Sequence, residues 1–317
     1  MAGFRSSALV TIAALVASAS AADAARFKAN NLEVNDVIGD IRIVTNSGDQ
    51  IDVRIDQGKV FRTVQVLYDA ETGTVTLQGE GDPNADNGCC EGRISRSFDA
   101  RADRRLKSGP PEGAFDDYPV IEIAMPRASN VSFEDVQMKL SLDPIEGALH
   151  MDACYVYGEA SAVGEARIGL VSGSRMVLGE VEAGLEVDLS GAADLAAASA
   201  SVVDIDISGS GQLSLGRIDG ILDASIAGSG LVRAARIDGP VTARIAGSGA
   251  VIGQSGRADP LKAIIEGSGG VYLEGSAAST DLRLSRSAEV RLGAVEGRIN
   301  RSGLGEVYVK GERVARK

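Results

Sequence analysis

Apolar residues recur at every second position in short segments punctuated by glycine, over most of the second half of the chain. A period of two is typical of a β-strand with one buried face. The side chains before each glycine are predicted to form inward columns: Leu185, Val187 and Leu189; Val203, Ile205 and Ile207; Leu222, Ala224 and Ile226; Val241, Ala243 and Ile245; Leu261, Ala263 and Ile265. A second strand is predicted after the glycine, from pairs such as Leu213 and Leu215, Val271 and Leu273, Val290 and Leu292, and Val307 and Val309.

The punctuating glycine belongs to a repeated Gly-Ser-Gly motif. Its first glycine lies at 209, 228, 247 and 267, with steps of 19, 19 and 20 residues, and weaker copies extend the repeat over residues 172–305. Such a fixed period is typical of a solenoid, whose coils stack at about 4.8 Å. An antiparallel sandwich would not bring the same side chain into register in successive coils. The repeat therefore predicts an all-β, parallel β-helix with turns of about 18–20 residues.

The Gly-Ser-Gly motif looks like part of a phosphate-binding loop, but it is better explained as a structural corner. Glycine permits the sharp corner between two short strands, and stacked corners leave little room beside the backbone. The motif repeats in every turn and opens no predicted helix, so it is not a phosphate site. The serines at its centre are predicted to stack as a hydroxyl ladder: Ser210, Ser229, Ser248, Ser268 and Ser287.

The start of the chain predicts export. A basic residue, Arg5, precedes an apolar stretch at 9–16 and then small residues, which is the pattern of a signal peptide over residues 1–24 with cleavage after Ala21 or Ala24. No stretch approaches the length of a spanning helix, so no transmembrane segment is expected. Residues 25–317 are predicted to form a single β-helix domain, and the charged, proline-containing residues 81–118 are predicted to form a long loop insertion.

Composition agrees with a narrow, repetitive core. The chain has 39 Gly, 8 Pro and no Trp, so tight turns are frequent and large side chains are rare. An apolar content of 44% argues against disorder. The net charge of −12 argues against nucleic acid or an anionic membrane surface as a partner.

The order of these features resembles a known family. Short opening strands, the segment Val-Ile-Glu-Ile-Ala-Met-Pro at 120–126 and the recurring Gly-Ser-Gly turns are similar to the head GIN domain family, which is described by the phrase "putative auto-transporter adhesin". The resemblance spans about residues 27–310, with 81–118 as an insertion. It implies a single-stranded, right-handed β-helix in an exported protein that has no established activity.

Fixed inward columns also define the outward ones, and one outward face is acidic. It carries Glu186, Asp188, Asp204, Asp206 and Asp223 over three adjacent turns. Three interpretations are open: a solvated acidic face, a weak divalent-cation or glycan-contact site because carboxylates are ligands for Ca²⁺, or a pair of carboxylates for acid and base catalysis. The small outward residues of a regular face predict no recessed pocket, so catalysis is not expected.

Other candidate chemistry centres on the cysteines. Cys89, Cys90 and Cys154 enter an oxidising compartment, so one of the vicinal pair is predicted to bond to Cys154 and to leave one thiol over. A zinc site made by the three cysteines and His150 is the alternative. Tyr155 and the nearby Tyr157 alternate outward beside this region, where either a sugar or protein contact or a covering loop would explain them.

Taken together, these patterns predict an exported structural, adhesive or ligand-presenting protein of the cell envelope, in the periplasm or at the cell surface. No enzyme activity and no cofactor are expected, and the predicted partner is a glycan or another envelope protein. A carbohydrate-active enzyme of the polysaccharide lyase or glycosidase kind is the alternative. The sequence leaves the oligomeric state open.

Overall fold

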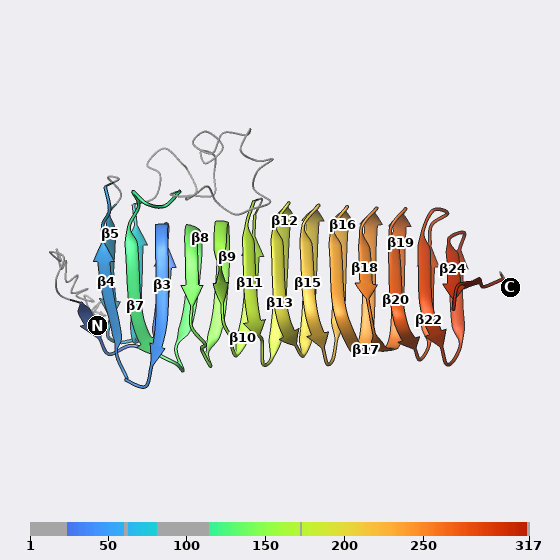
Figure 1. Cartoon of the computed structure of the whole chain (residues 1–317), viewed down its shortest axis with the longest axis horizontal. Coiled ribbons are helices and arrows are strands. Elements are labelled where there is room, and N and C mark those ends of the chain that lie inside the picture. Colours follow the sequence, from blue (N-terminus) through green and yellow to red (C-terminus); the bar gives the residue numbers. More distant parts are fainter. Residues whose placement is uncertain (1–23, 60–62, 81–113, 172, 316–317) are drawn as a thin grey trace, which may run out of the picture.

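The protein is an elongated parallel β-solenoid (Figure 1). The computed structural model describes residues 24–59, 63–80, 114–171 and 173–315. In these residues all regular secondary structure is β, and the strands stack into about 9 turns. A membrane-spanning helix is absent from these ranges. The predicted all-β solenoid is therefore confirmed.

Each turn contributes strands to two faces of the solenoid, which we call sheet A and sheet B. Four long strands pass through both sheets: β8 (Asn130–Leu142), β9 (Ala148–Ala160), β17 (Leu231–Gly247) and β19 (Gly256–Gly267). The other strands of sheet A are β2 (Asn31–Asn35), β5 (Val64–Asp69), β6 (Thr74–Gly79), β10 (Glu165–Leu170), β12 (Gly184–Gly191), β14 (Val202–Gly209), β16 (Leu222–Gly228), β21 (Thr280–Leu284) and β23 (Ile299–Gly303). The other strands of sheet B are β1 (Ala25–Phe27), β3 (Ile38–Asn46), β4 (Ile51–Asp56), β7 (Val120–Pro126), β11 (Arg175–Glu180), β13 (Asp194–Ala200), β15 (Gln212–Ile218), β18 (Ala250–Gly253), β20 (Gly270–Ala277), β22 (Glu289–Val295), β24 (Glu306–Val309) and β25 (Glu312–Arg313).

The core is a continuous stack of aliphatic side chains between the two sheets. The predicted inward columns are buried, and the partner residues on adjacent strands are in register: Leu185 lies opposite Val203, and Val203 lies opposite Leu222. Parallel pairing begins well before the Gly-Ser-Gly motif, because β8 already pairs with β9 and β9 with β10. The solenoid is therefore longer than the clear sequence repeat.

The glycine corners explain why this repeat is possible. Gly209, Gly228, Gly247 and Gly267 all have positive φ, from 119° to 135°. A Cβ on Gly228 would lie 2.4 Å from the carbonyl oxygen of Gly209 in the previous turn, and one on Gly267 would lie 2.2 Å from that of Gly247. Any other residue would meet both a strained backbone and a backbone clash.

The serine ladder is present in part. The Oγ atoms of Ser229 and Ser248 lie 2.9 Å apart. The backbone N–H groups of Ser210, Ser229, Ser248 and Ser268 each donate to a glycine carbonyl of the previous turn, as Ser210 does to Gly191 and Ser229 does to Gly209, both at 2.7 Å. Backbone hydrogen bonds, more than hydroxyl contacts, therefore join successive corners.

Antiparallel strands lie at both ends of the parallel stack. At the N-terminal end β5 pairs antiparallel with β6, and β4 pairs antiparallel with both β1 and β7. At the C-terminal end β25 turns back on β24. These hairpin-like pairs interrupt the regular coil at its ends, where a repeated parallel edge would otherwise invite further strands.

A disulfide and a small aromatic cluster lie where β9 passes from sheet A to sheet B. Cys154 is disulfide-bonded. The other two cysteines of the chain, Cys89 and Cys90, belong with most of the predicted 81–118 loop to the part outside the described residues. Phe115 is buried, and its ring centroid lies 6.4 Å from that of Tyr155, which is buried beneath it.

The corner glycines predict a sharp position dependence of stability. Gly228→Ala should lower the unfolding free energy by about 1–3 kcal/mol, because its Cβ would approach the Gly209 carbonyl in a left-handed backbone conformation. Gly184→Ala is the matched control, since a Cβ there would have no atom within 4 Å. Urea unfolding followed by circular dichroism would measure both, and equal stability of the two variants would contradict the explanation.

The disulfide predicts a defined thiol count. Of the three cysteines, two are expected in one bridge, so the unfolded, unreduced protein should titrate with one thiol per chain and the reduced protein with three. Peptide mapping without reductant would then show whether Cys89 or Cys90 is joined to Cys154. Three free thiols before reduction would contradict the bridge.

Candidate functional site

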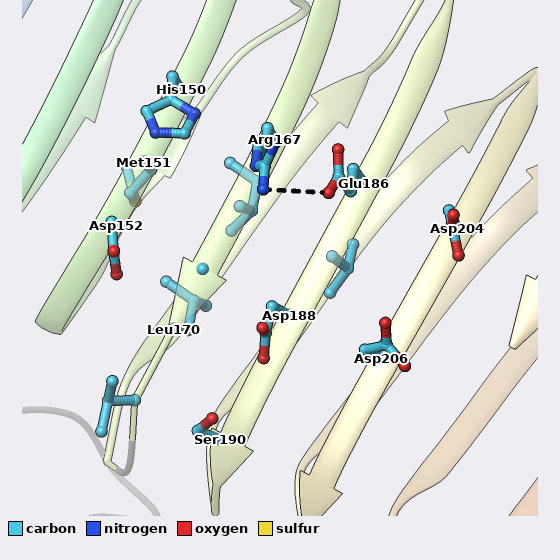
Figure 2. Close-up of a pocket in the computed structure, with 14 residues that line it drawn as sticks. His150, Met151, Asp152, Arg167, Leu170, Glu186, Asp188, Ser190, Asp204 and Asp206 are labelled. Atoms are coloured by element: carbon cyan, nitrogen blue, oxygen red, sulfur yellow. Dashed lines mark ion pairs between the residues drawn. The ribbon is translucent and has the colours of Figure 1, made fainter. Parts of the chain in front are cut away.

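Four of the five carboxylates that the sequence singled out line one surface groove on sheet A. Glu186 and Asp188 project from β12, and Asp204 and Asp206 project from β14 (Figure 2). The register places Glu186 beside Asp204 and Asp188 beside Asp206 on strands that lie about 4.8 Å apart. The inward-outward alternation of the strands thus brings these carboxylates together, as the sequence predicted.

The fifth carboxylate lies outside the groove. Asp223 is next to Asp204 in register, on β16, but it does not line the cavity. Its Oδ1 accepts a hydrogen bond from Nη1 of Arg244 at 2.5 Å, across the neighbouring strands β16 and β17. Beyond β14 the acidic column is therefore neutralised by a basic residue.

The groove has a volume of about 340 Å³ and continues toward β9 and β10, where His150, Asp152 and Arg167 line it. The prediction that a regular face would have no recess is wrong. The sequence singled out His150 only as a candidate zinc ligand, and Asp152 and Arg167 were not recognised because the Gly-Ser-Gly motif is absent there. Tracing each outward column toward the N-terminus, one turn at a time, would have identified Asp152, because Asp152 and Asp188 lie in the same column.

The recess arises from a missing side chain. The outward column runs from Asp152 through Gly169 to Asp188 and then Asp206. A Cβ on Gly169 would meet its nearest atom, Oδ1 of Asp152, at 3.4 Å, which is close to ordinary contact. Unlike the corner glycines, Gly169 is not required by the backbone. It leaves a gap between the carboxylates on either side.

The electrostatics of the groove disfavour additional negative charge. Burial raises the pKa of Asp188 above its usual value of 3.8, and the carboxylates of Asp206 and Asp152 raise it further. Burial also raises the pKa of Asp204, with further contributions from Asp223 and Asp206. Arg167 provides partial compensation, because its Nη2 lies 3.4 Å from Oε1 of Glu186 (Figure 2).

The zinc alternative at the cysteines is contradicted. The sulfur of Cys154 is already committed to a disulfide, and His150 lines the groove on sheet A instead. Among the residues that the structure describes, no group of three or more His, Cys, Asp or Glu side chains is placed to hold a metal ion. The carboxylates of the groove therefore lie side by side along the strands and do not converge on one point.

Tyr155 is covered, as the loop explanation predicted, since Phe115 packs over it. Tyr157 is half-buried on the same strand. The outer face of sheet B also carries Tyr272 and Tyr308, on β20 and β24.

Comparison with known proteins yields solved structures alone. No family model and no curated protein matches the chain. A "putative adhesin" from Parabacteroides distasonis is 14% identical with a TM-score of 0.43, over 90% of this chain and 94% of its own. Another "putative adhesin", from Parabacteroides merdae, is 14% identical with a TM-score of 0.39, over 90% and 95%. A "putative cell adhesion protein" from Clostridium sporogenes is 9% identical with a TM-score of 0.17, over 90% and 99%.

All three neighbours are described as adhesion proteins. The head GIN resemblance stays an interpretation, because no family model supports it. At these TM-scores the likeness carries no functional argument, so the proposals that follow are built on the residues of this chain.

The raised pKa values predict how stability depends on pH. The folded chain binds protons at Asp188 and Asp204 more tightly than the unfolded chain does. The stability that these protonated carboxyl groups contribute is therefore present below about pH 4, and it is lost as the pH rises through the raised pKa values. The variant Asp188→Asn with Asp204→Asn should therefore melt at a higher temperature than the wild type at about pH 7. This difference should shrink on acidification to about pH 4.

Melting curves of both proteins across this pH range give the measurement. Asp281→Asn is the matched control, since Asp281 lies in the same column as Asp204 but beside Lys262. A double variant that is no more stable than the wild type at neutral pH would contradict the electrostatic description of the groove.

Proposed function

We propose that this protein is an exported, non-catalytic protein of the cell envelope, adhesive or ligand-presenting, which binds a positively charged group of its ligand in the sheet A groove. The observation that carries the proposal is the gap at Gly169 in a column of aspartates. A side chain could have filled this position without a backbone clash.

Export is supported by two features that are independent of each other. The first residues have the pattern of a signal peptide. The disulfide at Cys154 is of a kind that persists in oxidising compartments and is rare in the cytosol. Both features favour the periplasm or the cell surface.

The groove favours a cationic group of a larger ligand. Its volume of about 340 Å³ is at the lower end of the range for small-molecule sites, so it would hold one or two chemical groups. Asp152 and Asp188 present acceptor oxygens on the two sides of the gap at Gly169, and Asp206 lies next to Asp188 in the same column. Burial and repulsion from Asp206 and Asp152 together raise the pKa of Asp188, and an ammonium group placed there would relieve the repulsion. An amino sugar or a lysine side chain carries such a group.

The rigid parallel scaffold fits a role in binding. Each carboxylate projects from a strand that is hydrogen-bonded to a neighbouring strand on each side. The groove is therefore formed before any ligand binds. Preorganised sites avoid the cost of ordering mobile side chains and loops. A long, stiff solenoid would also hold such a site away from the surface to which it is attached.

A carbohydrate-active enzyme is the second candidate, and one observation favours it. Carboxyl groups with raised pKa values in a recess are typical general acids and bases of glycosidases. Asp188 and Asp204 are two such groups. The same carboxylates would then protonate a leaving group or activate water. Binding without turnover distinguishes the first proposal from the second.

Binding of two matched oligosaccharides tests the groove. A glucosamine oligomer carries an ammonium on each sugar, whereas the N-acetylglucosamine oligomer of the same length carries none. We expect tighter binding of the glucosamine oligomer, weakened by added salt, and a loss of about tenfold in affinity for Asp188→Asn with Asp206→Asn. Calorimetry measures both, and Asp281→Asn on β21 serves as the control.

Two outcomes would count against this proposal. An aspartate double variant that binds the glucosamine oligomer as tightly as the wild type does would exclude the groove. Release of new reducing ends during prolonged incubation, lost in the double variant, would replace binding by catalysis.

A further inference from the structure

The outer face of sheet B carries a second outward column of a different kind. Tyr272 on β20, Arg291 on β22 and Tyr308 on β24 lie side by side in register, and Ile252 on β18 continues the column upstream. These strands lie near the C-terminal end of the solenoid, at the right of Figure 1. The column follows from the sequence pattern, because Tyr272 and Tyr308 alternate with the inward residues Val271, Leu273, Val307 and Val309.

Tyr272 lies flat against the sheet. A Cβ on Gly270, which points outward from the same strand, would lie 2.4 Å from the hydroxyl oxygen of Tyr272 and 2.5 Å from its Cζ. The ring therefore extends over Gly270 along the strand and does not stand up into solvent. Its outer side remains accessible, since the residue is half-buried. An aromatic ring in this orientation offers an apolar surface with a polar tip.

Tyr308 and Arg291 are also held in place without a ligand. The guanidinium carbon of Arg291 lies 5.4 Å from the ring centroid of Tyr308, within cation–π range. The hydroxyl of Tyr308 donates to Oε2 of Glu306 at 2.6 Å. Arg291 is paired with Glu289, whereas Glu306 is paired with Arg313 at 2.7 Å. The two carboxylates and the two guanidiniums thus neutralise each other around the rings.

We propose that Tyr272, Arg291 and Tyr308 form a platform that binds an uncharged glycan chain, with the sugar rings lying over the tyrosines. The tyrosines are two strands apart, about 9.6 Å, which is close to the length of a disaccharide. Sugar rings present an apolar face to an aromatic ring and hydroxyl groups at their edges. Arg291, Glu289 and Glu306 provide donors and acceptors for those hydroxyl groups.

Charge and shape favour a glycan over other polymers. Nucleic acid needs free cations to neutralise phosphates, and here the guanidiniums are already paired in a chain of net charge −12. A proline-rich peptide would stack on tyrosines too, but such peptides dock into grooves between aromatic rings. In this platform the rings lie in one row along a sheet surface.

The platform is independent of the acidic groove. It lies on the other sheet, on β20, β22 and β24, whereas the groove lies on the sheet A strands from β9 to β14. It also acts through ring surfaces and not through negative charge. An adhesive protein with both sites would contact a glycan-rich surface through two sets of residues. Variants of one site should leave the other unaffected.

An array of uncharged glucose, mannose, galactose and N-acetylglucosamine oligomers, followed by calorimetry with the tightest binder, tests the platform. Tyr272→Ala and Tyr308→Ala should each raise Kd about tenfold, whereas Tyr272→Phe, which keeps the ring, should change it little. Tyr68→Ala, which changes a half-buried tyrosine of β5 at the N-terminal end of the solenoid, is the matched control. Melting temperatures establish that each variant is folded.

The alternatives give distinct results. Absence of binding to every oligosaccharide on the array would overturn the proposal, as would a Kd that is unchanged in both alanine variants. Binding of a polyproline peptide in place of the oligosaccharides, lost in the same variants, would assign the platform to a protein partner. Asp188→Asn with Asp206→Asn should keep the wild-type affinity, so failure of the groove proposal remains separate.

Discussion

The regular coil from β12 to β19 depends on the close approach of backbone to backbone at the glycine corners. Gly209, Gly228, Gly247 and Gly267 lie directly over one another, and a single methyl group at any of them would collide with the carbonyl oxygen of the turn before. This contact keeps successive turns in register. Register then brings identical positions together along the molecule, in the core and on both outer faces.

The outward side chains of a solenoid lie in columns, one residue from each successive turn. A side chain has the residues one turn earlier and one turn later as its nearest neighbours, so charge accumulates or cancels along the stack. At Asp188 and Asp206 it accumulates, and the pKa of Asp188 rises. At Asp223 it cancels against Arg244. We therefore expect a function where the charges of a column do not cancel, or where a column lacks a side chain, as it does at Gly169.

Both candidate surfaces are preorganised by the same hydrogen-bonded strands, yet they would recognise different chemistry. The groove on sheet A offers concentrated negative charge in a recess. The platform on sheet B offers tyrosine rings whose neighbouring charges are already paired. Rigid side chains that need little ordering on binding suit weak contacts repeated along a surface, in which several modest interactions combine into firm attachment.

The sequence by itself determined the solenoid, its turn length and the faces of its strands, because period-two alternation and in-register glycines are local properties of the chain. It also placed Asp188 beside Asp206. It did not reveal the recess, since the contribution of Gly169 depends on which residues lie one turn away, where the motif has faded. Only the tertiary structure decided that Tyr155 is covered and that Tyr272 lies flat over Gly270, because these outcomes depend on packing between segments and on side-chain orientation.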